Sequence, residues 1–284
     1  MCRMLAMRPA TPSAARDVLS DFRKQARFGA TGTNELRTHP DGWGVVVEGE
    51  DGPRRLGRSV ADAFDDPGFE EVVQSASNVR AGSLVLAHLR NASVGGKRPE
   101  NTHPFVADGW AFAHNGTIHD SDRILAAGEP HEGETDSERF FRRFLDERKH
   151  GARPEDALRS TVDLIDARCT YSSLTCLFTD GTTLYGYRRL GADPAECGTR
   201  ECQQEHYQLG VGRRQGSPVV AQEPTHLGLE DWSGVPDGFF LEWREGEEPS
   251  ARPLETTTVA RPAGGRRTAG ERRQSSTSQR GPTE

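Results

Sequence analysis

The chain begins Met1-Cys2-Arg3, and Cys2 is the residue from which both a fold and an activity can be predicted. Removal of the initiator methionine would place a thiol and a free α-amine on the same residue. A model thiol titrates near ~8.5 and an α-amine near ~7.7–8.0, so at neutral pH the amine can accept the thiol proton. Such a residue is a nucleophile with its own base. A Met-Cys start is ordinary by itself, so the rest of the chain must supply the partners of this chemistry.

Composition limits the class of protein. The chain has 284 residues, a net charge of −7 and a mean hydropathy of −0.72. No apolar run approaches the ~20 residues of a membrane helix, and the N-terminus lacks the apolar segment of a secretory signal. We therefore expect a cytosolic protein that does not bind membranes and consists of one large domain or two small ones.

The charge is distributed unevenly along the chain. From about Arg252 onward the chain contains seven arginines and only three glutamates. The part before Arg252 is therefore more acidic than the net charge of the whole chain suggests. An acidic body argues against nucleic acid as a partner. From about residue 249 the sequence also loses its apolar periodicity. We expect a folded domain at residues 2–248 and a disordered basic tail at 249–284, either a solvated extension or a segment that binds an acidic partner.

The cysteines and histidines do not predict a metal centre. Five cysteines in a reducing compartment are expected to be thiols. Cys197, Cys202 and His206 suggest zinc, but the four-residue gap and the lack of a second CxxC motif weaken this interpretation. His88 and His103, like His114, lie on or beside expected strands, where hydrogen bonding is the commoner role. We expect no metal and no cofactor.

The order of expected elements predicts a layered α+β fold. Strands are expected at residues 2–7, 43–47, 54–58, 83–89, 105–106, 110–113, 173–179, 183–190, 207–212, 218–221 and 239–243. Helices are expected at residues 12–26, 135–148 and 154–167, with one or two more in 59–77 broken at Pro67-Gly68. Residues 28–38 read as a loop. Strands, then two helices, then strands again favour two sheets with outer helices over a doubly wound βαβ fold.

Four residues could complete the chemistry of an N-terminal thiol on an amide. Arg90 ends an expected strand, where a guanidinium can hold a carboxylate. Asn115-Gly116 offers a side-chain amide and an open backbone N–H for an oxyanion, and loss of one such donor costs roughly 2.7–4 kcal/mol. Asp136 could bind an ammonium group. Arg90 and Asp136 together would then recognise an α-amino acid head group.

Each of these residues also has a structural interpretation. Asn-Gly is a common turn dipeptide. Asp136 could cap the helix that begins there, as could Thr135. Arg90 could be a solvated charge or part of a surface ion pair. The joint appearance of these residues, in order, favours the functional interpretation.

Six motifs in order extend across nearly the whole expected domain. They are Met1-Cys2-Arg3, Asp41-Gly42-Trp43-Gly44, Ala87-His88-Leu89-Arg90, Asn101-Thr102-His103-Pro104-Phe105, Ala113-His114-Asn115-Gly116 and Gly133-Glu134-Thr135-Asp136-Ser137-Glu138. Weaker matches follow at 220–224 and 232–240. In these motifs the chain resembles the class II glutamine amidotransferases, the N-terminal nucleophile (Ntn) hydrolases that use cysteine.

The resemblance implies a fold and a set of roles. The fold would be a four-layer αββα sandwich with two antiparallel sheets between helical layers. Cys2 would be the nucleophile, with its own amine as the base, and Asn115 with Gly116 would form the oxyanion hole. Arg90 would bind the substrate α-carboxylate and Asp136 its α-amine.

Further residues are placed at the site by the same resemblance. Trp43 and Gly44, with Asp41, would shape the wall behind the thiol, and Ser93 would lie near the substrate carboxylate. We also count His114 among the substrate-binding residues. The chain departs from the family pattern at Asn91, where some relatives have an aromatic residue. It also departs at 12–38, which is longer and more helical than in compact members, and at 193–206, which looks inserted.

Three functions are considered, in decreasing order of preference. The first is a stand-alone amidohydrolase that cleaves glutamine or another γ-glutamyl amide through a γ-glutamyl thioester, similar to the hydrolase of ergothioneine assembly. We expect no fused synthetase domain, because the expected elements end near residue 245. The second is a glutaminase subunit that supplies ammonia to a separate synthetase. The third is a scaffold of the same fold without turnover.

Overall fold

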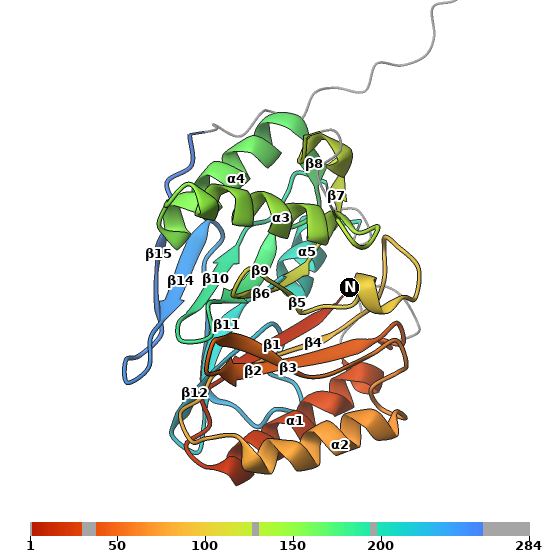
Figure 1. Ribbon diagram of the computed structural model, residues 1–284, viewed down its shortest axis with the longest axis vertical. Helices are drawn as coiled ribbons and strands as arrows, with labels where there is room; N and C mark the ends of the chain where they lie inside the picture. Colours follow the sequence, from red (N-terminus) through yellow and green to blue (C-terminus); the bar gives the residue numbers. More distant parts are fainter. Residues whose placement is uncertain (1, 30–37, 127–130, 194–197, 258–284) are drawn as a thin grey trace, which may run out of the picture.

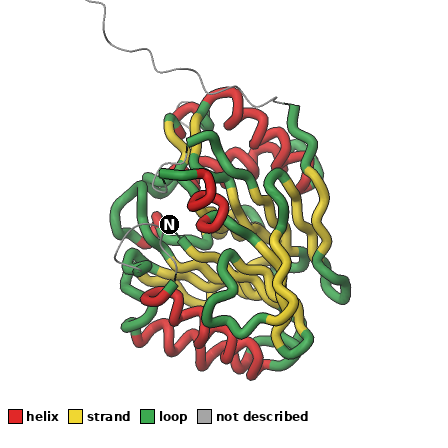
Figure 2. Tube along the Cα trace, turned by 180° about the vertical axis from the view of Figure 1, so that it is seen from behind, coloured by secondary structure: helices red, strands yellow, loops and turns green. Residues whose placement is uncertain are grey.

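The computed structural model describes residues 2–29, 38–126, 131–193 and 198–257. Two antiparallel sheets lie face to face between two helical layers (Figure 1). Seen from behind, the strands again form the centre, with helices above and below them (Figure 2). This is the predicted αββα sandwich, so the fold prediction is confirmed.

The first sheet has seven strands and holds the start of the chain near its centre. Its order is β13 (Glu230–Gly234), β11 (Gly210–Arg214), β12 (Ser217–Ala221), β1 (Arg3–Met7), β4 (Val85–Leu89), β2 (Trp43–Gly49) and β3 (Gly52–Ser59). The pairing of β1 with β12 on one side and β4 on the other brings residues from two distant parts of the sequence beside Cys2.

The second sheet has six strands. Its order is β15 (Ser250–Pro253), β14 (Phe239–Trp243), β10 (Leu184–Arg188), β9 (Thr175–Thr179), β6 (Trp110–Asn115) and β5 (Phe105–Ala107). Strands β7 (Ile118–His119) and β8 (Thr170–Tyr171) form a separate short pair. Strand β6 ends at Asn115, so this sheet delivers the predicted oxyanion residues at a strand end.

The outer layers contain the long amphipathic helices. Helices α1 (Pro12–Phe28) and α2 (Pro67–Ser75) cover the first sheet, and α3 (Asp136–Lys149) and α4 (Pro154–Arg168) cover the second (Figure 1). A short helix, α5 (Arg200–His206), and three 3₁₀ turns, η1 (Ala76–Asn78), η2 (Pro99–Asn101) and η3 (Ser121–Arg123), complete the described elements.

Helix starts follow from capping chemistry. Thr11 caps α1, and its side-chain oxygen accepts the N–H of Ala14. Thr135 caps α3 in the same way, through the N–H of Glu138, so Asp136 is not the cap but the first helical residue. Prolines occupy the first turn of α1, α2 and α4, where a missing N–H costs nothing.

Strand alternation divides the core into three layers. Along β1, Leu5 and Met7 pack towards α1 and α2, whereas Met4 and Ala6 pack between the two sheets. A third cluster joins the second sheet to α3 and α4. By the same alternation Cys2 lies on the side of β1 that faces the second sheet, and Arg3 lies on the helical side.

Several expected elements differ from the structure. Pro67-Gly68 does not break a helix but starts α2, because Asp66 caps it and Pro67 fits the first turn. The strand expected at 207–212 begins only at Gly210. Helix α5 runs to His206 and Tyr207 is its C-terminal cap, so the chain must leave the helix before the strand can start. Strands β7, β8, β13 and β15 were not predicted.

The described chain remains in the sheet beyond the expected boundary at residue 248. Strand β15 pairs with β14, and Leu254 after it is buried. The expected end of strand content near residue 245 is therefore corrected, and the folded part reaches Leu254. Most of the expected tail, residues 258–284, and most of the expected loop at 28–38 lie outside the described residues.

Candidate active site

Cys2 is held by the side-chain amide of Asn115. The backbone nitrogen of Cys2 donates to Asn115 Oδ1 at 3.0 Å, and Asn115 Nδ2 donates to the carbonyl oxygen of Cys2 at 3.0 Å. Asn115 is buried at the end of β6. Two strands from opposite sheets therefore meet at the nucleophile predicted from the sequence.

The thiol lies against the backbone of Asn91. The N–H of Asn91 points to Cys2 Sγ at 3.4 Å, and the thiol lies 3.5 Å from the carbonyl oxygen of the same residue. Burial raises the pKa of the Cys2 thiol, and the positive charges of Arg90 and Arg3 oppose this rise without cancelling it. A thiol in this setting needs a base to become a thiolate.

Arg3 and Glu223 form a buried ion pair next to Cys2. Arg3 Nε donates to Glu223 Oε2 at 2.6 Å, and both side chains are almost fully buried. The same guanidinium donates through Nη1 to the carbonyl oxygen of Cys2 at 2.7 Å. Gln25 of α1 donates to the carbonyl oxygen of Glu223 at 3.0 Å and so ties the pair to the helical layer.

Gln222 forms the third hydrogen bond of the Asn115 side chain. Asn115 Nδ2 donates to Gln222 Oε1 at 3.1 Å, and Gln222 is buried. The role of Gln222 and Glu223 was missed by the sequence reasoning, although both lie in a segment recognised as a weaker motif. The available signal was the alternation of an expected strand at 218–221, which places the next two residues on opposite faces.

Gly116 lies where no side chain fits. A Cβ atom at this position would be 2.0 Å from the carbonyl oxygen of Ser173. Within the described residues no carbonyl accepts the N–H of Gly116, so this donor is open beside the residue that holds Cys2. The geometry suits the predicted oxyanion donor.

Arg90 organises the loop that follows β4. It is buried, and it donates to the carbonyl oxygens of Val94 at 2.9 Å, Gly95 at 3.1 Å and Gly96 at 3.1 Å. In this arrangement the guanidinium does not extend into solvent. Its structural role differs from the solvated charge considered from the sequence, and its predicted contact with a substrate carboxylate stays a prediction.

Asp41 holds the same loop from the other side. Its Oδ2 accepts the N–H of Ala92 at 2.8 Å, and its Oδ1 pairs with Lys97 Nζ at 3.0 Å. The carbonyl oxygen of Arg90 accepts the backbone N–H of Asp41 at 3.1 Å. Residues 90–97 are therefore fixed at both ends beside the thiol.

Asp136 accepts a hydrogen bond from the segment that follows Asn115-Gly116. Its Oδ2 accepts the N–H of Ile118 at 2.6 Å, and burial raises the pKa of this carboxyl. His114 is internal, because its Nδ1 lies 2.9 Å from Ser137 Oγ and its Nε2 lies 3.0 Å from the carbonyl oxygen of Ser173. Burial lowers the pKa of His114. Because both ring nitrogens of His114 have partners inside the protein, its position does not favour direct contact with a substrate.

Trp43, Gly44 and Ser93 take different places. The Trp43 side chain packs against Phe69 of α2 and donates to Asp66, on the helical face of the first sheet, so it does not form the wall behind the thiol. Gly44 allows His103 to approach, since a Cβ atom would be 2.3 Å from its carbonyl oxygen. Ser93 is exposed, and its Oγ lies 2.7 Å from Thr117 Oγ1, across the start of the loop.

Histidines near the site do not assemble a metal centre. The rings of His88 and His103 are in contact, with centroids 4.4 Å apart and planes tilted by 34°, and burial lowers the pKa of both. Within the ranges that the structure covers, no three His, Cys, Asp or Glu side chains are arranged to hold a metal ion. Cys197 of the suggested zinc set lies outside those ranges, while Cys202 Sγ is 3.4 Å from His206 Nδ1.

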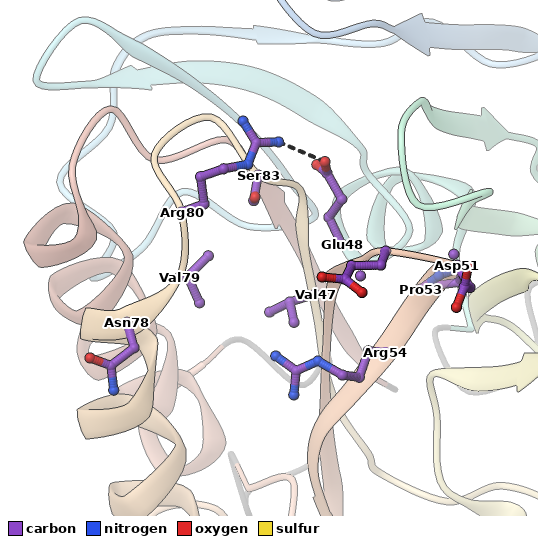
Figure 3. A pocket seen from close by; sticks show the side chains of 12 residues that line it. Val47, Glu48, Asp51, Pro53, Arg54, Asn78, Val79, Arg80 and Ser83 are labelled. Carbon is purple, nitrogen blue, oxygen red and sulfur yellow. Dashed lines mark hydrogen bonds and ion pairs between the residues drawn. The ribbon is translucent and has the colours of Figure 1, made fainter.

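A separate groove of about 740 Å³ lies at the β2–β3 hairpin, with residues 78–83 opposite it (Figure 3). Its wall includes Arg54, and Arg80 pairs with Glu48 at 2.7 Å beside it. None of the residues predicted for catalysis lines this groove.

No described helix is long and apolar enough to cross a membrane.

Comparison with known families gives one match over most of the chain. The model of the family "Glutamine amidotransferases class-II" matches residues 1–263. An uncharacterized protein of Methanocaldococcus jannaschii is 28% identical over 241 residues, covering 74% of this chain and 62% of that protein. YafJ of Escherichia coli K12, provisionally named a glutamine amidotransferase, is 32% identical over 146 residues, covering 50% of this chain and 52% of that protein. The matched region thus spans about half to three fifths of these relatives.

Solved structures share the fold. Glutamine phosphoribosylpyrophosphate amidotransferase from B. subtilis aligns with a TM-score of 0.60 at 16% identity, over 90% of this chain and 49% of that chain. A glutamine aminotransferase class-II domain protein from Silicibacter pomeroyi aligns with a TM-score of 0.58 at 23% identity, over 89% of this chain and 99% of that chain. At these identities the likeness supports the fold alone.

Proposed function

The chain belongs to the class II glutamine amidotransferases, and from this premise we propose that it cleaves a γ-glutamyl amide with the thiol of Cys2. The family prediction made from the motifs is confirmed at this level. Glutamine itself or a larger γ-glutamyl compound would be the substrate, glutamate would be released, and the reaction would take place in the cytosol.

One observation supports the proposal most strongly. Asn115 Oδ1 accepts the hydrogen bond of the Cys2 nitrogen at 3.0 Å. In the encoded chain this nitrogen is joined to Met1, and removal of Met1 would turn it into an α-amine at the same place. Asn115 Oδ1 would then accept a hydrogen bond from one N–H of the amine. The lone pair of the amine nitrogen would remain available to accept the proton of the thiol on the same residue.

The reaction can be written with these groups. The thiolate of Cys2 attacks the γ-carbonyl carbon, and the oxyanion is stabilised by the N–H of Gly116 and by Nδ2 of Asn115. Nδ2 can leave the Cys2 carbonyl oxygen, because Arg3 Nη1 still donates to that oxygen at 2.7 Å. The Cys2 ammonium returns its proton to the leaving nitrogen as the C–N bond breaks, and a γ-glutamyl thioester remains. Water attacks the thioester, which releases glutamate and regenerates the thiol.

Recognition of the glutamyl head group is assigned to Arg90 and Asp136. Arg90 would exchange part of its contacts with the loop carbonyls for the substrate α-carboxylate. Asp136 would accept the α-ammonium, whose positive charge would favour the ionised carboxylate despite burial. Ser93, at the rim of the same loop, would complete the pocket for the carboxylate.

Glutamate release provides the test. Purified protein beginning at Cys2 would be incubated with glutamine and a panel of γ-glutamyl amides, and glutamate would be measured, with Cys2→Ala as the inactive control. A glutamine-analogue electrophile would add its mass to the peptide that begins at Cys2. Failure of the whole panel together with an unmodified Cys2 would overturn the proposal.

Ammonia supply to a separate synthetase is the second candidate. The glutamine phosphoribosylpyrophosphate amidotransferase of the comparison is named for a second substrate besides glutamine, and the aligned region covers only 49% of that protein. Glutaminase activity that is weak alone and rises when a co-purifying acceptor enzyme is added would favour this function. A scaffold without turnover would instead retain Met1, which intact-mass measurement detects.

A further inference from the structure

We propose that Gln222 is a positioning residue that fixes the orientation of the Asn115 amide and, through it, the base of the reaction. This inference rests on the proposed function, because the base is the α-amine of Cys2. The carbonyl oxygen of Gln222 accepts from Asn115 Nδ2 at 3.1 Å, and Gln222 is 1% exposed.

The backbone places Gln222 at this point. Strand β12 pairs with β1 through Leu5 and Ala221, and the N–H of Gln222 continues the ladder to the carbonyl oxygen of Met4 at 3.1 Å. Val220 packs between the sheets, so alternation directs Gln222 to the same side, towards the end of β6. Its backbone is therefore set by the sheet.

The hydrogen-bond pattern leaves one orientation for Asn115. Its side chain touches the Cys2 nitrogen, the Cys2 carbonyl oxygen and Gln222. The Cys2 nitrogen can donate, and the Cys2 carbonyl oxygen can only accept. Rotating the Asn115 amide by 180° would set its NH₂ group against the Cys2 nitrogen and its oxygen against the Cys2 carbonyl oxygen, and it would break the hydrogen bond to Gln222 Oε1.

Gln222 Oε1 accepts the second hydrogen of Asn115 Nδ2 and so stabilises the observed orientation, while Gln222 Nε2 has no hydrogen-bond partner among the described residues. Without this acceptor, a rotated Asn115 would direct its NH₂ group at the Cys2 amine, and that group would bond to the lone pair needed for the thiol proton. The amine would then be a poorer base at the same position. Gln222 acts through Asn115 and does not itself touch the reacting atoms in this scheme.

The pH dependence should carry the signature of this role. An acceptor facing the amine favours its protonated form, so loss of the fixed acceptor lowers the amine pKa. In Gln222→Met, which keeps the size of the side chain but not its acceptor, the acidic limb of kcat/KM is expected to move to lower pH. In Gln222→Glu, a carboxylate near the amine favours the ammonium form, and the acidic limb is expected to move to higher pH.

The experiment compares wild type, Gln222→Met and Gln222→Glu. Gln222→Met is expected to lower kcat by ~10-fold or more, with KM nearly unchanged, because general-base catalysis contributes ~10²–10⁴-fold and would be weakened rather than removed. Gln222→Glu is expected to retain more activity than Gln222→Met. Thr161→Val is the matched control, since Thr161 is fully buried in α4 and its hydroxyl makes one internal hydrogen bond, to the carbonyl oxygen of Ala157 at 2.8 Å.

A second readout does not depend on any substrate. The rate at which iodoacetamide alkylates Cys2 would be followed against pH by mass measurement of the N-terminal peptide. Opposite shifts of this profile in the Met and Glu variants would support the proposal even if the γ-glutamyl substrate is misassigned. Coincident profiles for all three proteins, or a kcat in Gln222→Met equal to or above that of wild type, would overturn it.

Discussion

The carboxylate of Asp41 accepts the backbone N–H of Ala92 at 2.8 Å, one residue after the backbone groups that touch the thiol. Asp41→Ala removes this anchor and the ion pair with Lys97. We expect kcat/KM for glutamate release to fall by ~10-fold, because an active-site loop that is less well positioned costs roughly this much or more. Lys97→Met is the control, since an exposed ion pair is worth only ~0–1 kcal/mol. Equal losses in both variants would contradict the role of the carboxylate.

Asn115→Ala removes the contacts on both sides of Cys2 and one oxyanion donor. We expect kcat to fall by ~10²–10³-fold, the cost of losing one such donor, with a further loss from the unfixed nucleophile. Steady-state kinetics on the best substrate of the panel provide the measurement. A change confined to KM would show that Asn115 only binds substrate.

Breaking the Arg3–Glu223 pair should destabilise the protein strongly. The partner left behind would be a buried charge, and removal of one member of such a pair costs about 3–5 kcal/mol. We expect Glu223→Gln to lower the free energy of unfolding in urea by an amount of this order. The exposed pair Arg16–Asp17 offers the comparison, and Asp17→Asn should change stability by less than about 1 kcal/mol.

Gly116→Ala should impair both folding and activity. The new methyl group would lie 2.0 Å from the carbonyl oxygen of Ser173, which is backbone and cannot move aside without shifting the segment between β8 and β9 and its bridge to Leu190. Overpacking of this kind typically costs ~1–3 kcal/mol, measurable by thermal unfolding. Gly234→Ala is the matched control, because no atom lies within 4 Å of its Cβ position. Wild-type stability in both variants would contradict the packing described.

Acid should destabilise the protein through His88. Burial lowers its pKa to about 3, whereas in the unfolded chain it titrates near ~6.5. The unfolded state therefore binds one more proton between these values, and stability present above pH ~6.5 is lost as the pH falls. The slope is ~1.4 kcal/mol per pH unit for one proton. His88→Phe, which keeps an aromatic ring beside His103, should reduce the slope of unfolding free energy between pH 6 and 4 by about this amount.

Sequence reasoning reached the fold because the elements carry local signals. The apolar spacing of α1 and the caps Thr11 and Thr135 are short-range features, and the hairpin turns are marked by Asp-Gly pairs. The exposed pattern of β13 has no such periodicity, and it exists only because β11 offers a partner. Strand β15 was missed for the same reason, with Ser250 to Pro253 exposed along the sheet edge.

The site was partly accessible from sequence. Residue types and order identified Cys2 and Asn115, which are joined by hydrogen bonds in the structure. They did not reveal which face of a strand each side chain takes, so Trp43 was placed at the thiol although it packs against α2. Nor could they show Arg90 bonded to its own loop, since such contacts depend on where a chain turns back on itself.

Arg3 and Glu223 are separated by 220 positions along the chain, yet their side chains are in direct contact. On a translating ribosome the reactive sulfur would emerge with the first residues, long before the strand that supports it. A nascent polypeptide that ends before Glu223 would thus carry Cys2 and Arg3 without the carboxylate that pairs with the Arg3 guanidinium. Under the proposed function, catalytic competence would follow the synthesis of Gln222 and Glu223, which contact Asn115 and Arg3 in the folded protein.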